Sequence, residues 1–363
     1  MQPLLEVMED VRVGRRPPWP CQTNVRLPNP HITSLEHVPE FGSNPGNLRM
    51  LKLIPRRLRR KAPLVVVLHG CGQSARDITH GAGWTKLANE SGFALLAPEQ
   101  RRANNPQRGF NWFLPADNTR DSGECLSIRQ MIECMIKEHG LDRKRVYITG
   151  LSAGAAMASV LLATYPEVFA GGAIIAGLPF GTATNLVHAI ALMKGKLDQS
   201  SDQLGDRVRA ASSHRGAWPK VSIWHGAADR VVAASNADAV TRQWCNVHGL
   251  CVENARQSQV CGQTRRFWRD PSGRQVLESF IIPNMGHAVP VDVSGKSGHV
   301  YGAHARFFED AGIASTYQIA KFWGLPLPRG SKHAPRGEAR RMTRLSVLRQ
   351  RVTEGKSLWS QCL

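Results

Sequence analysis

The pentapeptide Gly150–Gly154 (Gly-Leu-Ser-Ala-Gly) is the stretch of this sequence whose residue types and spacing point most directly to chemistry. It follows the strand-like residues 145–149 and precedes a helical pattern of small residues over 153–162. A G-x-S-x-G sequence between a strand and a helix is typical of a nucleophile elbow, a strained turn that lifts the serine hydroxyl above a sheet. The flanking glycines are expected because a Cβ there would collide with the neighbouring strand or helix. The pattern alone would arise by chance in roughly one in ten chains of this length, so its context must decide.

A serine hydroxyl becomes a nucleophile only when a base takes its proton, and an acid must orient that base. In the α/β-hydrolase order, the acid and then the histidine follow the serine. Asp229 is the predicted acid because it comes after a strand at 221–224 and a glycine turn, where sites of α/β proteins assemble. The other candidate acids lie in variable or helical segments and are interpreted as surface charges: Asp198, Asp202, Asp206 and Asp238.

His287 is the predicted base because it also follows a strand, residues 280–282, and a turn. Gly286 is expected to let the backbone bend so that the imidazole can reach over the sheet. Four other candidate histidines after Ser152 lack this position at a strand end or precede a plausible acid: His225, His248, His299 and His304.

The negative charge that develops on an attacked carbonyl oxygen requires two hydrogen-bond donors. One is expected to be the backbone N–H of Ala153, which follows the nucleophile. The other should come from the loop after an early strand, and residues 68–73 (Leu-His-Gly-Cys-Gly-Gln) fit that loop. We therefore predict the Cys71 N–H as the second donor, with an inert thiol.

The elements that must position these residues alternate between strands and helices. Apolar runs predict strands at 48–54, 64–68, 93–97, 146–149, 173–176, 221–224 and 276–282. Helical spacing marks 83–91, 127–139 and 316–323. This alternation predicts an α/β-hydrolase fold with a mostly parallel central sheet and helices on both faces. The expected division is an N-terminal extension (1–40), a catalytic domain (41–325, with a variable region at 180–218) and a basic, flexible C-terminal tail (326–363).

Composition narrows the range of functions. The formal charge of +19 is concentrated partly at 56–61 and partly after Pro328, and these clusters could bind an anionic partner or simply be solvated. No nucleic-acid-binding signature accompanies them. The eight cysteines show no C-x-x-C spacing, so we expect neither a metal nor a cofactor, although one or two disulfides among Cys245–Cys261 are an alternative to free thiols if the protein is exported. No apolar run is long enough to span a membrane, and the visible N-terminus lacks a signal-peptide core, which favours the cytoplasm.

Several longer motifs in sequential order resemble the poly(3-hydroxybutyrate) (PHB) depolymerase-type esterase family over about residues 46–325. They are Asn47–Met50, Leu68–Gln73, Phe110–Phe113, Gly150–Gly154, Thr164–Ala170, Ile174–Pro179, Trp224–Gly226, Met285–His287 and Ser315–Tyr317. The resemblance implies a serine esterase that forms an acyl-enzyme, with Ser152, Asp229 and His287 as its triad. It also implies that Asn111, Trp112 and Phe113 line the substrate cleft.

The family is similar to feruloyl and acetyl-xylan esterases, and many of its members are secreted, so an extracellular location is the alternative. Ala155 and Ala227 stand where relatives often have Gly and Asp. No additional substrate-binding domain is visible after the core, which favours soluble esters or oligomers over solid polymer. The expected function is hydrolysis of carboxylic esters or hydroxyalkanoates. The alternatives are a feruloyl or acetyl-xylan type of esterase, or a non-catalytic protein of the same fold that binds an anionic partner. The sequence does not indicate an oligomeric state.

Overall fold

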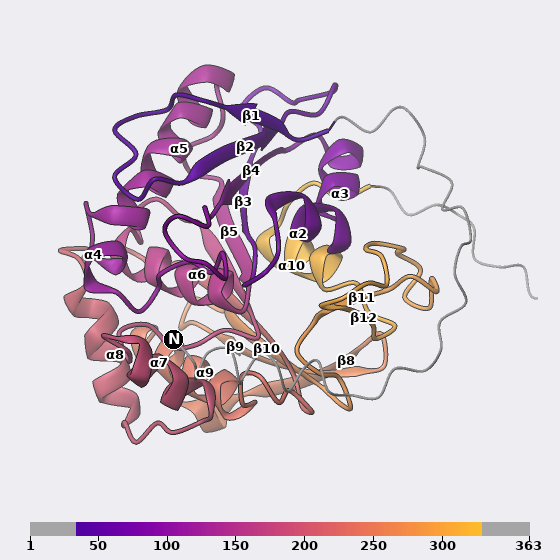
Figure 1. The fold of residues 1–363 in the computed structure, drawn as a ribbon. Coiled ribbons are helices and arrows are strands. Elements are labelled where there is room, and N and C mark those ends of the chain that lie inside the picture. The colour runs from indigo at the N-terminus through magenta and orange to yellow at the C-terminus, as the bar shows by residue number, and fades with distance from the viewer. Residues whose placement is uncertain (1–33, 329–363) are drawn as a thin grey trace, which may run out of the picture. The chain divides into compact units, whose positions relative to one another are not determined.

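A ten-stranded sheet runs through residues 34–328, the part of the 363-residue chain that the computed structural model describes. The six central strands are parallel, and the strands at both edges are antiparallel (Figure 1). Across the sheet the order is β1 (Glu36–Val38), β2 (Arg49–Leu53), β4 (Ala94–Glu99), β3 (Leu64–Leu68), β5 (Val146–Leu151), β6 (Gly171–Ile175), β7 (Lys220–Gly226), β10 (Gln275–Ile282), β9 (Gln263–Arg269) and β8 (Arg256–Val260).

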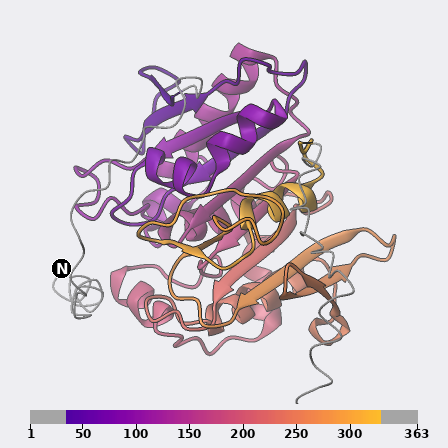
Figure 2. The ribbon, with the colours of Figure 1, turned by 90° about the vertical axis from the view of Figure 1, so that its right-hand side faces the viewer.

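Helices cover both faces of this sheet. One face packs against α5 (Gly123–His139), α6 (Ala153–Thr164), α8 (Ser201–Ala210) and α9 (Ser235–Val247). The other face packs against α2 (Ala75–Gly81), α3 (Trp84–Ser91) and α10 (Ser315–Trp323). The connections contain α4 (Pro115–Asn118), α7 (Leu186–Met193), the 3-10 helix η1 (Val252–Asn254) and a small parallel pair of strands, β11 (Val289–Val291) and β12 (Phe308–Asp310). Figure 2 shows the hairpin of β8 and β9 at the edge of the sheet.

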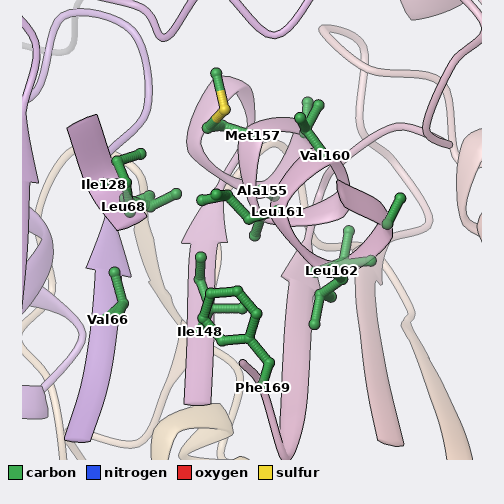
Figure 3. Close-up of a cluster of buried hydrophobic side chains, with 14 of the residues drawn as sticks. Val66, Leu68, Ile128, Ile148, Ala155, Met157, Val160, Leu161, Leu162 and Phe169 are labelled. Carbon is green, nitrogen blue, oxygen red and sulfur yellow. The ribbon is translucent and has the colours of Figure 1, made fainter. Parts of the chain in front are cut away.

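Strand β3 illustrates why the sheet has two cores. Its sequence Leu-Val-Val-Val-Leu is buried throughout, and successive side chains point to opposite faces. Val66 and Leu68 join the core beneath α6, while Val65 and Val67 join the core on the other face. Figure 3 shows the first of these cores, where α6 packs over the parallel strands. Burial on both faces explains the continuous apolar runs, as expected for central parallel strands.

The predicted α/β-hydrolase fold is confirmed. Each predicted strand and helix is present. The structure also has elements that were not predicted, among them β1 within the stretch 1–40, the helices α7 and α8 within 180–218, the helices α2 and α9, and the strands β8 and β9. Residues 1–33 of the predicted extension and 329–363 of the predicted tail lie outside the described residues.

The sequence also led to expectations about the cysteines and about membrane-spanning segments. All six cysteines between residues 34 and 328 are free thiols, including Cys245, Cys251 and Cys261. Within that same range, the helices are too short or too polar to cross a bilayer.

Candidate active site

Ser152 lies at a sharp turn between β5, which ends at Leu151, and α6, which begins at Ala153. Its backbone has φ 56° and ψ −119°, a strained conformation for a residue with a side chain. The turn needs small neighbours: a Cβ on Gly150 would lie 2.4 Å from the backbone of Gly154, and a Cβ on Gly154 would lie 2.4 Å from the Leu68 carbonyl oxygen. The G-x-S-x-G sequence therefore forms the elbow that its pattern predicts.

The sheet brings the three predicted catalytic residues to one edge. Leu151 of β5 pairs with Ile175 of β6, which pairs with Trp224 of β7, which pairs with Phe280 of β10. These strands are parallel, so their carboxyl ends lie together. Ser152, Asp229 and His287 all follow these aligned positions within a few residues.

Asp229 lies in a turn after β7, and both of its carboxylate oxygens have hydrogen-bonding partners. Oδ1 accepts hydrogen bonds from the backbone N–H groups of Val231 (2.8 Å) and Val232 (2.9 Å). Oδ2 lies 2.7 Å from His287 Nδ1 and 3.2 Å from His225 Nε2. Burial alone would raise the pKa of this carboxyl, but the interactions with His225 and His287 outweigh it and hold the pKa well below its ordinary value. Asp229 is therefore a fixed, ionised acceptor.

His287 is oriented by that carboxylate and by the backbone around it. Its Nδ1–H donates to Asp229, which leaves Nε2 for a second partner. Its ring meets Phe307 edge to face, with centroids 6.4 Å apart. The backbone N–H groups of Ala227 and Ala228 donate to the carbonyls of Ile282 and Met285, each at 2.9 Å, so the turn carrying Asp229 is fastened to the turn carrying His287.

The bend before His287 differs from the expectation. Gly286 has an ordinary φ, and a Cβ there would contact only Glu309, at 4.0 Å. Asn284, with φ 59°, adopts the left-handed conformation of this turn. The glycine that the turn requires is Gly226, because a Cβ there would lie 2.3 Å from the carbonyl oxygens of Met285 and Gly286.

The Ser152 hydroxyl makes no hydrogen bond to any residue within 34–328. The Asp229–His287 contact is thus formed, while a serine–imidazole hydrogen bond is not. In sites without substrate, such bonds are often long and shorten only when substrate binds.

Cys71 and Ala153, whose backbone N–H groups are the predicted oxyanion donors, line the same cavity as Ser152. The Cys71 N–H makes no hydrogen bond to another residue of the described chain. Ala153 is the first residue of α6, so its N–H has no partner inside the helix. The loop is fixed by a turn in which Gln73 N–H donates to Gly70 O (3.2 Å) and Gly70 N–H donates to Gln73 Oε1 (2.8 Å). Burial raises the pKa of the Cys71 thiol to about 11, so this group stays protonated at neutral pH.

A cavity of about 230 Å³ opens beside Ser152. Trp112 and Phe113, two of the residues that the family resemblance implies for a substrate cleft, line it together with Ser152, Cys71 and Ala153. The predicted residue Asn111 is not part of the wall in the described chain. Its side-chain oxygen instead accepts a hydrogen bond from Asn105, which does line the cavity (3.1 Å).

The model of the family described as esterase PHB depolymerase matches residues 49–268. The chain is 40% identical to poly(3-hydroxyalkanoate) depolymerase C of Paucimonas lemoignei over 81% of this chain and 71% of that protein. It belongs to the PHB depolymerase esterase family.

Two other esterases resemble this chain in sequence or in fold. Feruloyl esterase B of Talaromyces stipitatus is 33% identical over 74% of this chain and 76% of its own. The solved acetyl xylan esterase from Aspergillus awamori shares the fold, with a TM-score of 0.68 at 22% identity over 81% of this chain and all of that one. The protein is therefore a carboxylic ester hydrolase, a serine esterase of the PHB depolymerase type, and the alternative of a non-catalytic binder is set aside.

The sequence did not predict a role in the site for His225. Its side chain is buried, and Nε2 lies between two oxygens, Val232 O (2.8 Å) and Asp229 Oδ2 (3.2 Å). Because both neighbours are acceptors, Nε2 must carry the proton. The signal in the sequence was its position four residues before the predicted acid, at the end of the same strand.

The sequence predicts that the protein binds no metal ion. Between residues 34 and 328, histidine, cysteine, aspartate and glutamate side chains form no cluster of three or more with metal-binding geometry.

Proposed function

We propose that Ser152 is the nucleophile of this esterase, His287 its general base and Asp229 the acid that orients the base. The observation that carries the proposal is that the three residues lie together at the carboxyl ends of the parallel strands. The strained serine turn and the Asp229–His287 pair follow aligned positions on parallel strands, and the cavity opens at that serine. Asp229, being ionised and buried, stabilises the imidazolium that forms during the reaction.

The proposed reaction has two stages. In the first, Ser152 Oγ bonds to the ester carbonyl carbon while His287 Nε2 takes the hydroxyl proton, and the N–H groups of Cys71 and Ala153 stabilise the oxyanion. Collapse of this intermediate breaks the bond to the alcohol, which leaves with the proton from His287. In the second stage, water attacks the acyl-enzyme with the same base, and the acid is released with Ser152 restored.

The names of the relatives suggest the range of substrates. They include a poly(3-hydroxyalkanoate) depolymerase and a feruloyl esterase. We propose that this enzyme hydrolyses carboxylic esters, with hydroxyalkanoate esters among them.

The nucleophile is tested by replacing Ser152 with alanine and measuring turnover of p-nitrophenyl butyrate. We expect kcat to fall by at least about 10⁴-fold, with loss of covalent labelling by a fluorophosphonate probe. Ser159→Ala is the matched control, because this serine is also on the elbow helix but is buried in the core away from the cavity. Undiminished turnover in Ser152→Ala, or a probe adduct on another residue, would refute the assignment.

A further inference from the structure

The cavity beside Ser152 lies on the acyl side of the proposed reaction centre. In acyl transfer the imidazole must protonate the leaving alcohol, so the alcohol occupies the side of the serine where the imidazole lies. His287 is not part of the cavity wall among the described residues, and its ring faces Phe307 instead. The cavity wall does contain Ser152, Cys71 and Ala153, which contact the carbonyl in the proposed mechanism. The space away from His287 is therefore left for the acyl group.

The wall of this cavity is mainly apolar. Apart from Ser152 and Cys71, polar side chains come only from the segment Asn104–Gln107, and no charged side chain of the described chain lines the cavity. The remaining lining is aromatic and aliphatic and includes Phe110, Leu178, Leu186, Ile190, Met193 and Val232. An apolar wall of this kind favours hydrocarbon over a sugar or a charged group.

The size of the cavity excludes a close fit to small acyl groups. A dry, apolar cavity of about 150 Å³ is large enough to bind benzene. At about 230 Å³, this cavity has room for an aromatic ring or a chain of at least six carbons. An acetyl group, with one methyl beyond the carbonyl, would leave most of the wall without contacts.

Helix α7 contributes four residues to the wall of the cavity. Leu186, Ala189, Ile190 and Met193 all line it. The C-terminal end of the helix is fixed, since Ala233 N–H donates to Met193 O (2.8 Å) and Asn236 Nδ2 donates to Leu192 O (2.9 Å). Because α7 is anchored to the segment that follows Asp229, its side chains form a preformed boundary.

We infer that the enzyme takes apolar acyl groups of about six carbons or more, and that α7 sets their limiting size. This inference rests on the proposed function of Ser152. A hydrocarbon chain and an aryl ring present the same chemistry to such a wall, so the test includes both.

The acyl preference is measured as kcat/KM for the p-nitrophenyl esters of acetate, butyrate, octanoate and 3-phenylpropionate. Each additional buried methylene should raise kcat/KM by roughly fourfold until the cavity is full. We expect octanoate or 3-phenylpropionate to exceed acetate by at least tenfold, and the better of the two identifies the chain or the ring as the preferred occupant. Acetate as the best substrate would overturn the inference.

The role of α7 is tested by reducing the cavity from the helix side. Ile190→Trp and Met193→Trp should each lower the octanoate-to-acetate ratio of kcat/KM at least tenfold. Val187→Trp is the matched control, because Val187 is on the same helix but is 74% exposed and outside the cavity wall. Its ratio should stay within twofold of the wild type. Thermal melts by circular dichroism confirm that each variant is folded.

The outcomes separate this inference from the proposed function. If Ser152→Ala abolishes turnover while both tryptophan variants keep the wild-type ratio, the nucleophile stands and the acyl inference fails. If wild-type protein hydrolyses none of the esters and takes up no fluorophosphonate, the proposed function itself fails.

Discussion

At the scale of single residues, the carboxylate of Asp229 interacts with two imidazoles. His287 Nδ1 and His225 Nε2 both approach Oδ2, and two backbone N–H groups occupy Oδ1. Each donor to this buried carboxylate lowers the negative charge available to the others. His225 is therefore placed to position Asp229 and to moderate how strongly it attracts a proton to His287, without reaching the substrate cavity itself.

His225→Leu should lower kcat/KM about tenfold, because hydrogen bonds to charged groups typically contribute about 1.5–3 kcal/mol and part of that is lost from the orientation of Asp229. With one donor removed, the carboxylate stabilises the protonated imidazole of the active site more strongly. The acid limb of the kcat/KM profile should therefore move to higher pH. A pH profile from 5 to 9 measures both effects.

His225→Gln is the matched variant for that prediction, because the Nε2 of the glutamine side chain can still donate a hydrogen bond toward Val232 O and Asp229. It should recover most of the lost activity and return the acid limb toward the wild-type position. Equal profiles for the leucine and glutamine variants would indicate that His225 only fills space.

At the scale of the elements, the site depends on the close approach of the turns after β7 and β10. Gly226→Ala would bring a Cβ to 2.3 Å from the carbonyl oxygens of Met285 and Gly286, so the turn carrying His287 must move. A displacement of about 1 Å at a catalytic group can reduce the rate by about 10²-fold. We expect a loss of that order in kcat for Gly226→Ala.

Gly286→Ala is the counterpart, because its Cβ would meet only Glu309 at 4.0 Å and its φ suits any residue. Its kcat should remain within a few-fold of the wild type, although it is closer in sequence to His287. Steady-state kinetics on p-nitrophenyl butyrate compare the two variants, and the argument fails if Gly286→Ala is the more damaging change.

The elements that the sequence predicts correctly are those with a strong local pattern. The central strands, such as β3, contain continuous β-branched runs, because they are buried on both faces. Helix α7 (Leu-Val-His-Ala-Ile-Ala-Leu-Met) is apolar on most sides, so it has no period that identifies a core-facing stripe. Strand β8 (Arg-Gln-Ser-Gln-Val) is a polar edge strand, which reads as a loop.

The site follows the same rule. Ser152, Asp229 and His287, the proposed triad, could be selected from the sequence because each follows a strand at the carboxyl edge of the sheet. His225 and the α7 wall could not, since their roles depend on contacts between segments that are distant along the chain.

At the scale of the whole molecule, buried ionisable groups connect the site to stability. Glu124, in the first turn of α5, is fully buried, and its oxygens accept hydrogen bonds from Gln100 Nε2 and from Asn111 N (2.9 Å). Burial, together with the nearby charge of Asp117, raises the pKa of Glu124 to about 8. Burial lowers the pKa of His248 to about 4 and also lowers that of His69. These groups act in different ranges of pH.

The buried histidines affect the free energy of unfolding at acidic pH. An unfolded histidine binds a proton below about pH 6.5, while buried His69 and His248 resist it, so the free energy of unfolding falls as the pH drops below that value. Glu124 acts in the opposite sense. The unfolded glutamate loses its proton near pH ~4.3, whereas the folded one keeps it up to about pH 8, so the free energy of unfolding falls as the pH rises through that interval.

Between pH 6.5 and 8 the Glu124 effect should exceed the opposing effect of the histidines, because an unfolded histidine is already half neutral at pH 6.5 and loses its remaining charge well below pH 8. Wild-type protein should lose roughly 1–2 kcal/mol of unfolding free energy over this range, at up to ~1.4 kcal/mol per pH unit. Glu124→Gln should abolish this loss and leave only the smaller, opposite effect of the histidines, whatever the absolute stability of the variant is. Glu133→Gln, on the same helix but with a lowered pKa and partial exposure, should keep the wild-type slope. Urea unfolding at pH 6.5, 7.25 and 8.0 gives the three slopes, and a pH-dependent loss that persists in Glu124→Gln would assign it to another group.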